Sequence, residues 1–381
     1  MLKILTVFGT RPEAVKMAPV VKKLAETPGI EARVCVTAQH RQMLDQVLEL
    51  FDIHPHYDLN LMRENQSLAG LSAEILTHLD PILADFNPDW VLAQGDTTTV
   101  AMTSLLCYYR RIRFGHVEAG LRTHDKWAPF PEEINRRIAG VIADLHFAPT
   151  NWSKGNLLRE GVDENIIKVT GNTVIDALQF VAQQPEPEEV RVLLAKLRLS
   201  NEKRETSENS PLASRRLILV TAHRRENFGA PMENICNALL QLASRGDVEI
   251  VYPVHLNPNV QEPVNKLLKG VEHITLLPPL DYLPLVHLMK RAYLILTDSG
   301  GIQEEAPAFG IPTLVLRDVT ERPEGVDAGT LKLTGTETAQ ITAEASLLLD
   351  NPSAYQAMSQ ASNPYGDGHA AERIVRELQV L

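Results

Sequence analysis

The feature that most constrains the fold is a regular alternation of short runs rich in Val, Ile and Leu with longer amphipathic segments. The short runs are almost continuously apolar, which is typical of parallel strands buried on both faces. Strands that alternate with helices form right-handed βαβ units, so the pattern predicts parallel sheets covered by helices. In the first half we predict strands at 4–8, 33–37, 90–93, 114–117, 146–148 and 167–169, and helices near 13–26, 42–50, 68–86, 98–109 and 153–160.

Two polar stretches interrupt the alternation and predict a second domain. Residues 183–189 carry two prolines and an acidic run, which indicates a linker, and the Ser-rich stretch 201–216 predicts a surface loop. Strands are then expected at 217–221, 249–253, 273–276, 293–297 and 313–316. We therefore predict an α/β protein with two Rossmann-like, doubly wound domains facing across a cleft. They comprise residues 1–182 with a C-terminal helix at 366–381, and residues 183–365.

Composition excludes several classes of protein. The 381 residues suffice for two hydrophobic cores, and the net charge of −11 argues against a nucleic-acid partner. Three cysteines without CxxC spacing favour a reducing compartment and argue against a structural zinc site. No apolar run approaches the roughly 20 residues that span a bilayer, and the N-terminus shows no signal-peptide pattern. We expect a cytoplasmic protein that binds no membrane and no metal.

The stretch 294–305 predicts a phosphate site. It comprises an apolar strand, a Gly-rich turn and the first residues of a helix. Free backbone N–H groups and the positive end of the helix dipole suit an anion there. Ser299 adds a hydroxyl donor, and Glu304 and Glu305 are placed to reach sugar hydroxyls. A phosphate joined to a sugar would fit, although an ordinary capped helix explains the same pattern.

A second anion site is indicated after the first strand. Gly9 permits a tight turn, Arg11 follows it, and Lys16 lies one turn into the helix that comes next. This basic pair suits a pyrophosphate, with a surface salt bridge as the simpler alternative. The turn has no G-x-G-x-x-G pattern and the next strand is not followed by an acid, so a dinucleotide cofactor is not expected.

Three acidic residues at strand or helix ends are candidates for proton transfer. Asp96 follows strand 90–93, and could instead cap the next helix. Glu118 follows strand 114–117 directly, where an acid is costly unless it is paired or used. Glu132 begins a helix after Pro131. Its spacing of four residues from Arg136 also fits a simple pair on the helix surface.

The second domain opens with a dense polar cluster at 221–227, immediately after a strand. His223 can exchange a proton near neutral pH, and the two arginines that follow it can grip phosphate. His255 also follows a strand and is a weaker candidate. The segment 320–325 follows the last long strand and is expected to line the same cleft.

Taken together, these segments resemble the non-hydrolysing UDP-N-acetylglucosamine 2-epimerase family. The resemblance rests on seven motifs that occur in order over nearly the whole chain. They are Phe-Gly-Thr-Arg-Pro-Glu (8–13), Gln-Gly-Asp-Thr-Thr (94–98), Gly-His-Val-Glu-Ala-Gly-Leu-Arg (115–122), Pro-Phe-Pro-Glu-Glu (129–133), Thr-Ala-His-Arg-Arg-Glu-Asn (221–227), Thr-Asp-Ser-Gly-Gly-Ile-Gln-Glu-Glu-Ala-Pro (297–307) and Arg-Asp-Val-Thr-Glu-Arg-Pro-Glu-Gly (317–325). Any one motif is weak evidence, whereas the ordered set is specific. The polar stretch at 201–216 is the main departure.

The resemblance implies a GT-B type fold with the active site between the two domains. It implies interconversion of UDP-N-acetylglucosamine and UDP-N-acetylmannosamine, through loss of the C2 proton and of UDP to give 2-acetamidoglucal. It implies neither a nicotinamide nor any other cofactor. A homodimer and a supply of ManNAc for surface polysaccharide are further implications.

The resemblance also implies roles for individual residues. Three carboxylates are expected to act as acid and base, and two cations support them. His223 is expected both to take part in catalysis and to hold the diphosphate. The carboxylates are Asp96, Glu118 and Glu132; the supporting cations are Lys16 and Arg136; the diphosphate groups are Arg11, His223, Ser299, Gly300 and Gly301; the ribose ligand is Glu305. A second, regulatory site for the substrate would use Gln39, Gln42 and His255.

Three other functions are compatible with parts of this pattern. A GT-B glycosyltransferase would share the donor-binding domain but does not need several acid/base groups around C2. A hydrolysing epimerase would release free N-acetylmannosamine, and the bifunctional forms carry a kinase domain for which this chain has no room. A non-catalytic nucleotide-sugar sensor could dispense with the three carboxylates.

Overall fold

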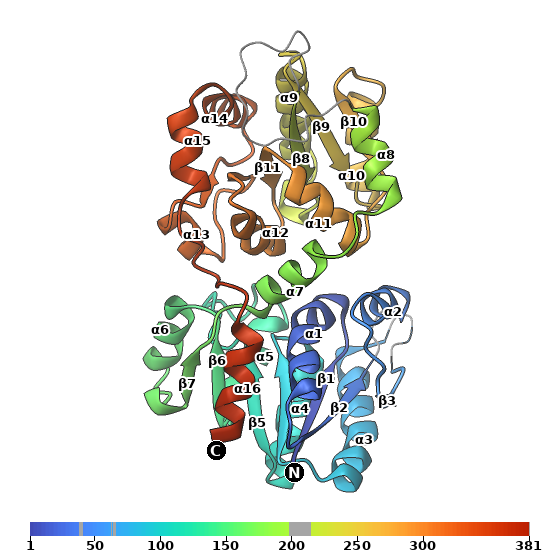
Figure 1. Ribbon diagram of the computed structural model, residues 1–381, viewed down its shortest axis with the longest axis vertical. Coiled ribbons are helices and arrows are strands. Elements are labelled where there is room, and N and C mark those ends of the chain that lie inside the picture. The colour runs from blue at the N-terminus through green and yellow to red at the C-terminus, as the bar shows by residue number, and fades with distance from the viewer. Residues whose placement is uncertain (38–40, 62, 64–65, 198–214, 381) are drawn as a thin grey trace. The chain divides into compact units, whose positions relative to one another are not determined.

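The computed structural model describes residues 1–37, 41–61, 63, 66–197 and 215–380, and it divides the chain into two compact units (Figure 1). Unit 1 comprises Met1–Gln179 and Tyr365–Leu381, and unit 2 comprises Phe180–Pro364. Each unit is a parallel sheet with its own core. The predicted class, α/β with two Rossmann-like parts, is confirmed.

The sheet of unit 1 has seven parallel strands in the order β3-β2-β1-β4-β5-β6-β7. The order reverses between β1 and β4, which makes the sheet doubly wound. The strands are β1 (Leu2–Phe8), β2 (Ile30–Val36), β3 (Tyr57–Asp58), β4 (Trp90–Gln94), β5 (Arg113–Val117), β6 (Leu145–Ala148) and β7 (Ile167–Val169). All five residues of β4 are buried, as the apolar sequence predicts for a central parallel strand.

Helices cover both faces of this sheet because right-handed crossovers run in opposite directions from the reversal point. Helices α3, α4 and α5 contribute apolar side chains to one core with β1, β4 and β5. The helices of unit 1 are α1 (Arg11–Glu26), α2 (Arg41–Leu50), α3 (Leu68–Phe86), α4 (Thr98–Arg110), α5 (Glu132–Ile142), α6 (Asn151–Arg159), α7 (Thr173–Ala182) and α16 (Ala370–Val380). The division between the units falls within α7.

Unit 2 repeats this plan with six parallel strands in the order β10-β9-β8-β11-β12-β13. Its reversal point lies between β8 and β11. The strands are β8 (Arg216–Thr221), β9 (Val248–Pro253), β10 (Ile274–Leu277), β11 (Leu294–Thr297), β12 (Thr313–Val315) and β13 (Leu331–Leu333). The helices are α8 (Glu188–Lys196), α9 (Ala230–Ala243), α10 (Pro258–Leu268), α11 (Tyr282–Arg291), α12 (Gly300–Glu305), α13 (Pro323–Asp327), α14 (Thr338–Asp350) and α15 (Pro352–Ser359). Helices α9, α10 and α14 share one core with β8 and β9.

The last helix of the chain returns to unit 1, where α16 packs against α1 (Figure 1). Asp176 of α7 accepts hydrogen bonds from the backbone N–H groups of Ala370 (3.2 Å) and Ala371 (2.8 Å). A carboxylate at this position satisfies donors that the helix itself cannot pair. Asp176 therefore anchors the beginning of α16 to α7.

The differences from the predicted elements are small and have physical causes. Strand β3 was not predicted because it has only two residues, and the three-residue strand β13 was also not predicted. Helices α7 and α8 were also not predicted, although α8 begins within the proposed 183–189 linker. The predicted loop at 201–216 lies mostly outside the described residues. At its end the prediction was wrong, since Arg216 is the first residue of β8.

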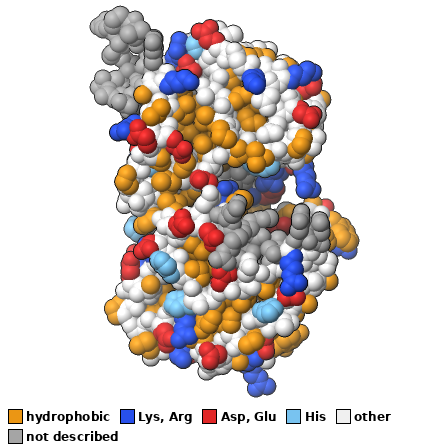
Figure 2. Space-filling model, turned by 90° about the vertical axis from the view of Figure 1, so that its right-hand side faces the viewer, with side chains coloured by type: hydrophobic (Ala, Val, Ile, Leu, Met, Phe, Trp, Pro, Cys, Tyr) orange, Lys and Arg blue, Asp and Glu red, His pale blue; other side chains and the backbone are white. Residues whose placement is uncertain are grey.

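Acidic and basic side chains are both spread over the side shown in Figure 2, so neither charge dominates this face.

No helix within the described ranges combines the length and the apolar character needed to cross a membrane.

A test of the fold concerns Gly120, which has φ +92° and lies against the backbone of Ser153. A Cβ on residue 120 would lie 2.3 Å from the Ser153 carbonyl oxygen, whereas a Cβ on Gly161 (φ +84°) would meet nothing within 4 Å. We expect Gly120→Ala to lower the free energy of unfolding by about 3 kcal/mol and Gly161→Ala by about 1 kcal/mol, because only the first adds a steric overlap to the backbone strain.

Tryptophan fluorescence during urea unfolding measures this effect selectively. All three tryptophans of the chain, Trp90, Trp127 and Trp152, belong to unit 1. Equal losses in the two variants would contradict the close approach of Gly120 to Ser153.

Candidate functional site

Four of the polar segments singled out in the sequence lie at the reversal points of the two sheets. In unit 1, residues 9–11 follow β1 and residues 95–97 follow β4. In unit 2, residues 222–224 follow β8 and residues 298–299 follow β11. Loops diverge at a reversal point, and doubly wound sheets bind their ligands there, beyond the carboxyl ends of the strands.

Glu118 is the most heavily coordinated of the predicted carboxylates. It follows β5 with φ +62° and is 8% exposed. Lys16 of α1 forms a close ion pair with its Oε1, and Asn172 donates to the same oxygen at 3.2 Å. The side-chain amide of Gln94 donates to Oε2. A carboxylate surrounded by an ammonium group and two amide donors is held in one orientation.

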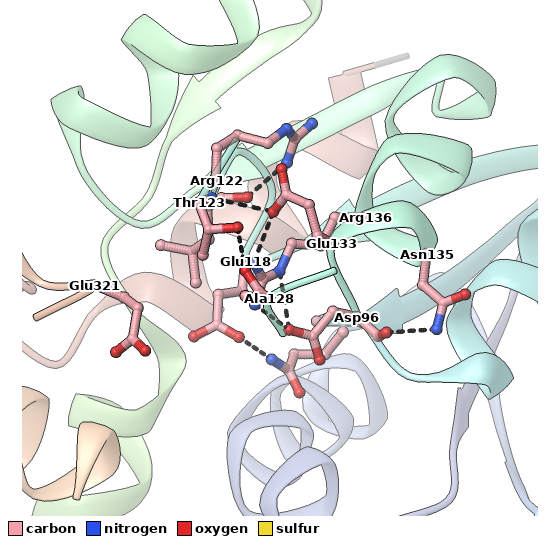
Figure 3. A network of polar contacts seen from close by, with 12 residues as sticks. Asp96, Glu118, Arg122, Thr123, Ala128, Glu133, Asn135, Arg136 and Glu321 are labelled. Atoms are coloured by element: carbon pink, nitrogen blue, oxygen red, sulfur yellow. Dashed lines mark hydrogen bonds and ion pairs between the residues drawn. The ribbon is translucent and has the colours of Figure 1, made fainter. Parts of the chain in front are cut away.

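Asp96 is bound by α5 through its side chain and its backbone (Figure 3). Arg136 donates to the Asp96 Oδ2 from Nε at 2.9 Å and from Nη2 at 2.6 Å. Asn135 donates to the Asp96 carbonyl at 2.9 Å. The capping role considered for Asp96 was wrong, because Thr97 is the N-cap of α4 and accepts from the Val100 N–H.

Glu132 lies in the first turn of α5, beside this network. Its Oε2 is buried and has no hydrogen-bond partner among the described residues. The surface pair considered between Glu132 and Arg136 is not formed, since Arg136 binds Asp96 and Glu133 instead. A buried carboxylate oxygen without a partner is costly, and such atoms cluster where a ligand or a proton is handled.

The turn after β1 is fixed by Glu13, which is 2% exposed. Its carboxylate accepts from the N–H groups of Gly9 (3.1 Å) and Thr10 (2.7 Å), and from the hydroxyl of Thr97 (2.7 Å). Burial raises the pKa of Glu13, and these hydrogen bonds oppose that rise. Glu13 thereby joins the two loops at the reversal point. Arg11 lies at the start of α1, and no hydrogen bond or ion pair links it to another described residue.

Two buried histidines of unit 1 are uncharged at neutral pH. His116 of β5 and His146 of β6 are direct partners in the strand register. Burial lowers the pKa of His116 to about 4 and that of His146 to about 3, so both rings are neutral. The His116 Nε2 lies 2.7 Å from the Gly95 carbonyl oxygen, where it supports the loop that carries Asp96.

In unit 2 the polar cluster after β8 is organised by Asp298, which follows β11 and is fully buried. Its Oδ2 accepts from the backbone N–H groups of His223 (2.8 Å) and Arg224 (2.7 Å) and from the amide of Asn227 (3.0 Å). The His223 Nδ1 lies 3.8 Å from the Asp298 Oδ1. His223 is 39% exposed and is therefore open to a ligand while its backbone is held.

The beginning of α12 presents small residues and two differently paired acids. Ser299 is the N-cap, and its side chain makes no capping hydrogen bond. A Cβ on Gly300 would lie 3.0 Å from the Arg322 guanidinium, so this cation lies directly against the turn. Glu304 binds Arg322 at 2.9 Å. Glu305 is 6% exposed and accepts from the Tyr282 hydroxyl at 3.2 Å.

Glu321 keeps a negative charge beside this turn. Burial alone would raise its pKa, but hydrogen bonds and charge from Arg317, together with the charge of Arg322, lower the pKa of Glu321 to about 2. The segment 317–322 is therefore held by ion pairs: Glu321 binds both Arg317 and Arg322, and Arg322 also binds Glu304 of α12.

The residues considered for a regulatory site are placed only in part. Gln39 lies outside the described residues, and Gln42 is described only as part of α2. His255 is exposed and stacks on His223, with ring centroids 5.3 Å apart and planes inclined by 19°. Within the described ranges no three His, Cys, Asp or Glu side chains gather in an arrangement suited to a metal ion.

Several residues of these networks were given no functional role from the sequence, among them Gln94, Glu133, Asn172 and Asp298. Asp298 carried a usable signal, because it is an acid directly after a buried strand, as Glu118 is. Gln94 and Asn172 carried none, since an uncharged amide at a strand end is common. Their role depends on β4 and β7 lying in the same sheet as β5.

Known proteins with similar sequences and structures agree on one family. The family model described as UDP-N-acetylglucosamine 2-epimerase matches residues 22–379. A UDP-N-acetylglucosamine 2-epimerase of Escherichia coli K12 is 55% identical over 381 residues, covering 99% of this chain and 98% of the relative.

Solved structures give the same result. The UDP-GlcNAc 2-epimerase of Neisseria meningitidis, solved bound to UDP-GlcNAc, is 47% identical with a TM-score of 0.86, and the alignment covers 100% of both chains. A Staphylococcus aureus structure with UDP is 48% identical with a TM-score of 0.86, covering 100% of this chain and 96% of that one. The chain therefore belongs to the UDP-N-acetylglucosamine 2-epimerase family.

Proposed function

We propose that this protein interconverts UDP-N-acetylglucosamine and UDP-N-acetylmannosamine by inverting C2 of the sugar. The proposal is supported by membership of the family and by the names of relatives that are similar over their full length. The observation that carries it is the gathering of Asp96, Glu118 and Glu132 at the carboxyl edge of one sheet. A glycosyltransferase has no need for several acid/base groups around C2.

The chemistry proceeds by elimination and re-addition. A base takes the C2 proton, the C2–H electron pair forms the C1–C2 double bond of 2-acetamidoglucal, and UDP leaves C1 with the C1–O electron pair. UDP then returns to C1 while an acid delivers a proton to the opposite face of C2. Carboxylates suit both steps, and typically contribute factors of about 10² to 10⁴ in rate.

Within unit 1 we assign the proton transfers to Asp96, Glu118 and Glu132. Lys16 forms an ion pair with Glu118, and Arg136 forms one with Asp96. Glu132 has a buried oxygen free of hydrogen bonds to the described residues, which suits direct contact with a reacting group. His223 of unit 2 remains a fourth candidate for acid/base catalysis.

Within unit 2 we assign the UDP portion to the groups after β8 and β11. His223, Ser299, Gly300 and Gly301 would hold the diphosphate, and Glu305 would accept from the ribose hydroxyls. Arg11 of unit 1, which is not paired within the described part of the chain, stays a diphosphate ligand predicted from the family resemblance. Stabilising the departing UDP in this way lowers the barrier for elimination.

Four finer features stay predictions. The cytoplasmic location is predicted from composition. The family resemblance predicts a homodimer, a supply of ManNAc for surface polysaccharide, and substrate regulation through Gln39, Gln42 and His255. Sedimentation analysis of the purified protein tests the dimer directly.

The reaction is tested by proton NMR of the purified protein with UDP-N-acetylglucosamine in D₂O. We expect UDP-N-acetylmannosamine carrying deuterium at C2, because the abstracted proton exchanges with solvent. Free N-acetylmannosamine with UDP would indicate a hydrolysing enzyme. An unchanged spectrum at saturating substrate would overturn the proposal in favour of a transferase or a sensor.

Substitution of the carboxylates tests their role in proton transfer. We expect Asp96→Asn and Glu118→Gln to lower kcat by about 10² to 10⁴, the usual contribution of a positioned acid or base, and to leave UDP affinity unchanged. Glu164→Gln is the matched control, since Glu164 is an exposed carboxylate of unit 1 paired with Lys154. Full activity of Glu118→Gln in the D₂O assay would remove that residue from the mechanism.

Substitutions in unit 2 test the binding of UDP. Ser299→Ala and Glu305→Ala should each weaken UDP binding about tenfold, because each removes a hydrogen bond in which the ligand or the protein is charged. Calorimetric titration with UDP measures the change, and the exposed Ser353→Ala of the same unit is the control. Unchanged UDP affinity in both variants would place the nucleotide elsewhere.

A further inference from the structure

Glu133 is a fully buried carboxylate to which the sequence analysis assigned no catalytic or binding role. It is the second residue of α5 and its side chain has 0% exposure. A buried ion is expensive to keep unless every lone pair is satisfied. The groups that bind the Glu133 carboxylate therefore indicate which parts of the structure it holds in place.

Two of these contacts hold the chain that follows Glu118. The Glu133 carboxylate accepts from the backbone N–H groups of Thr123 (3.1 Å) and His124 (3.2 Å), and His124 has the left-handed φ of +64°. The Glu133 N–H donates to the Pro129 carbonyl oxygen at 3.2 Å. The irregular segment 119–131, between Glu118 and α5, is thus tied to Glu133 at two points, residues 123–124 and residue 129.

The remaining contacts reach Asp96 through a shared cation (Figure 3). Arg136 donates to Glu133 from Nη1 at 3.1 Å and to Asp96 from Nε and Nη2. The guanidinium fork is planar and rigid, so fixing one edge on Glu133 fixes the direction in which the other edge meets Asp96. Arg137 adds a second cation, with its Nε 3.5 Å from the Glu133 Oε1.

Glu133 itself is badly placed for proton transfer. It has no exposed surface, and its two oxygens together accept from two backbone amides and a guanidinium. Its neighbour Glu132 is the opposite case, with a buried oxygen that makes no hydrogen bond to any described residue. Both residues sit in the same helical turn, so anchoring Glu133 also fixes the turn that carries Glu132.

We infer that Glu133 is a positioning residue for the C2 proton transfers: it orients Asp96 through Arg136, holds the segment after Glu118, and locks the turn that carries Glu132. This inference rests on the proposed epimerase function. It assigns to one buried carboxylate the relative placement of three candidate catalytic groups.

The test compares Glu133→Gln and Glu133→Asp with the wild-type protein in the D₂O exchange assay. Glu133→Gln removes the charge and points an N–H donor at groups that are themselves donors. We expect kcat to fall roughly 10- to 100-fold, the effect of misplacing reacting groups by about 1 Å, with UDP affinity unchanged. Glu133→Asp keeps the charge on a shorter side chain and should recover part of the lost rate.

A control separates positioning from general stability. Leu79→Ala truncates a fully buried side chain of α3, a helix of the same unit that contributes no residue to the hydrogen-bond network described above. It should lower the stability of unit 1, followed by tryptophan fluorescence, and leave kcat unchanged at temperatures where the variant is folded.

Four results would overturn the inference. They are a wild-type kcat in folded Glu133→Gln, a parallel rise in the Kd for UDP, an equal loss of kcat in Leu79→Ala, or failure of both Glu133 variants to fold, which would mark a purely structural residue. A wild-type protein that forms no UDP-N-acetylmannosamine would instead refute the proposed function. The two failures are therefore distinguishable.

Discussion

The reversal of strand order in each parallel sheet is the constraint on which the candidate site depends. Right-handed crossovers send the chain in opposite directions from β1 and β4, and likewise from β8 and β11. The loops at these points diverge and leave their backbone and side chains open beyond the strand ends. Arg11 and Asp96 of unit 1, and His223 and Ser299 of unit 2, lie in or beside these loops because the topology puts them there.

Within that frame, buried carboxylates organise the loops. Glu13 joins the loops after β1 and β4, Glu133 holds the segment after Glu118, and Asp298 gathers the segment after β8. Each accepts several backbone or side-chain donors, which is the condition under which a buried charge is tolerated. The carboxylates assigned to catalysis have other partners: Glu118 and Asp96 face cations, and Glu132 has an oxygen without a protein partner in the described part of the chain.

The difference between these two sets of carboxylates explains why some residues could be predicted from the sequence and others could not. An acid after a buried strand is visible in the sequence, and so Asp96 and Glu118 were identified. Helical spacing offered a pair between Arg136 and Glu132 as the simpler alternative, whereas the structure pairs Arg136 with Asp96, forty positions away, and with Glu133. Helical spacing describes only neighbours on the same helix, and Asp96 lies in the loop after β4.

The sequence by itself determined the fold class, the position of most strands and helices, and the family, because hydrophobic periodicity and ordered motifs are local properties of the chain. The tertiary structure decided the order of the strands, and with it which polar groups meet. Gln94, Lys16 and Asn172 converge on Glu118 only because β4, β5 and β7 share a sheet with α1 beside it. Contacts between residues far apart in the chain depend on packing, which no local pattern encodes.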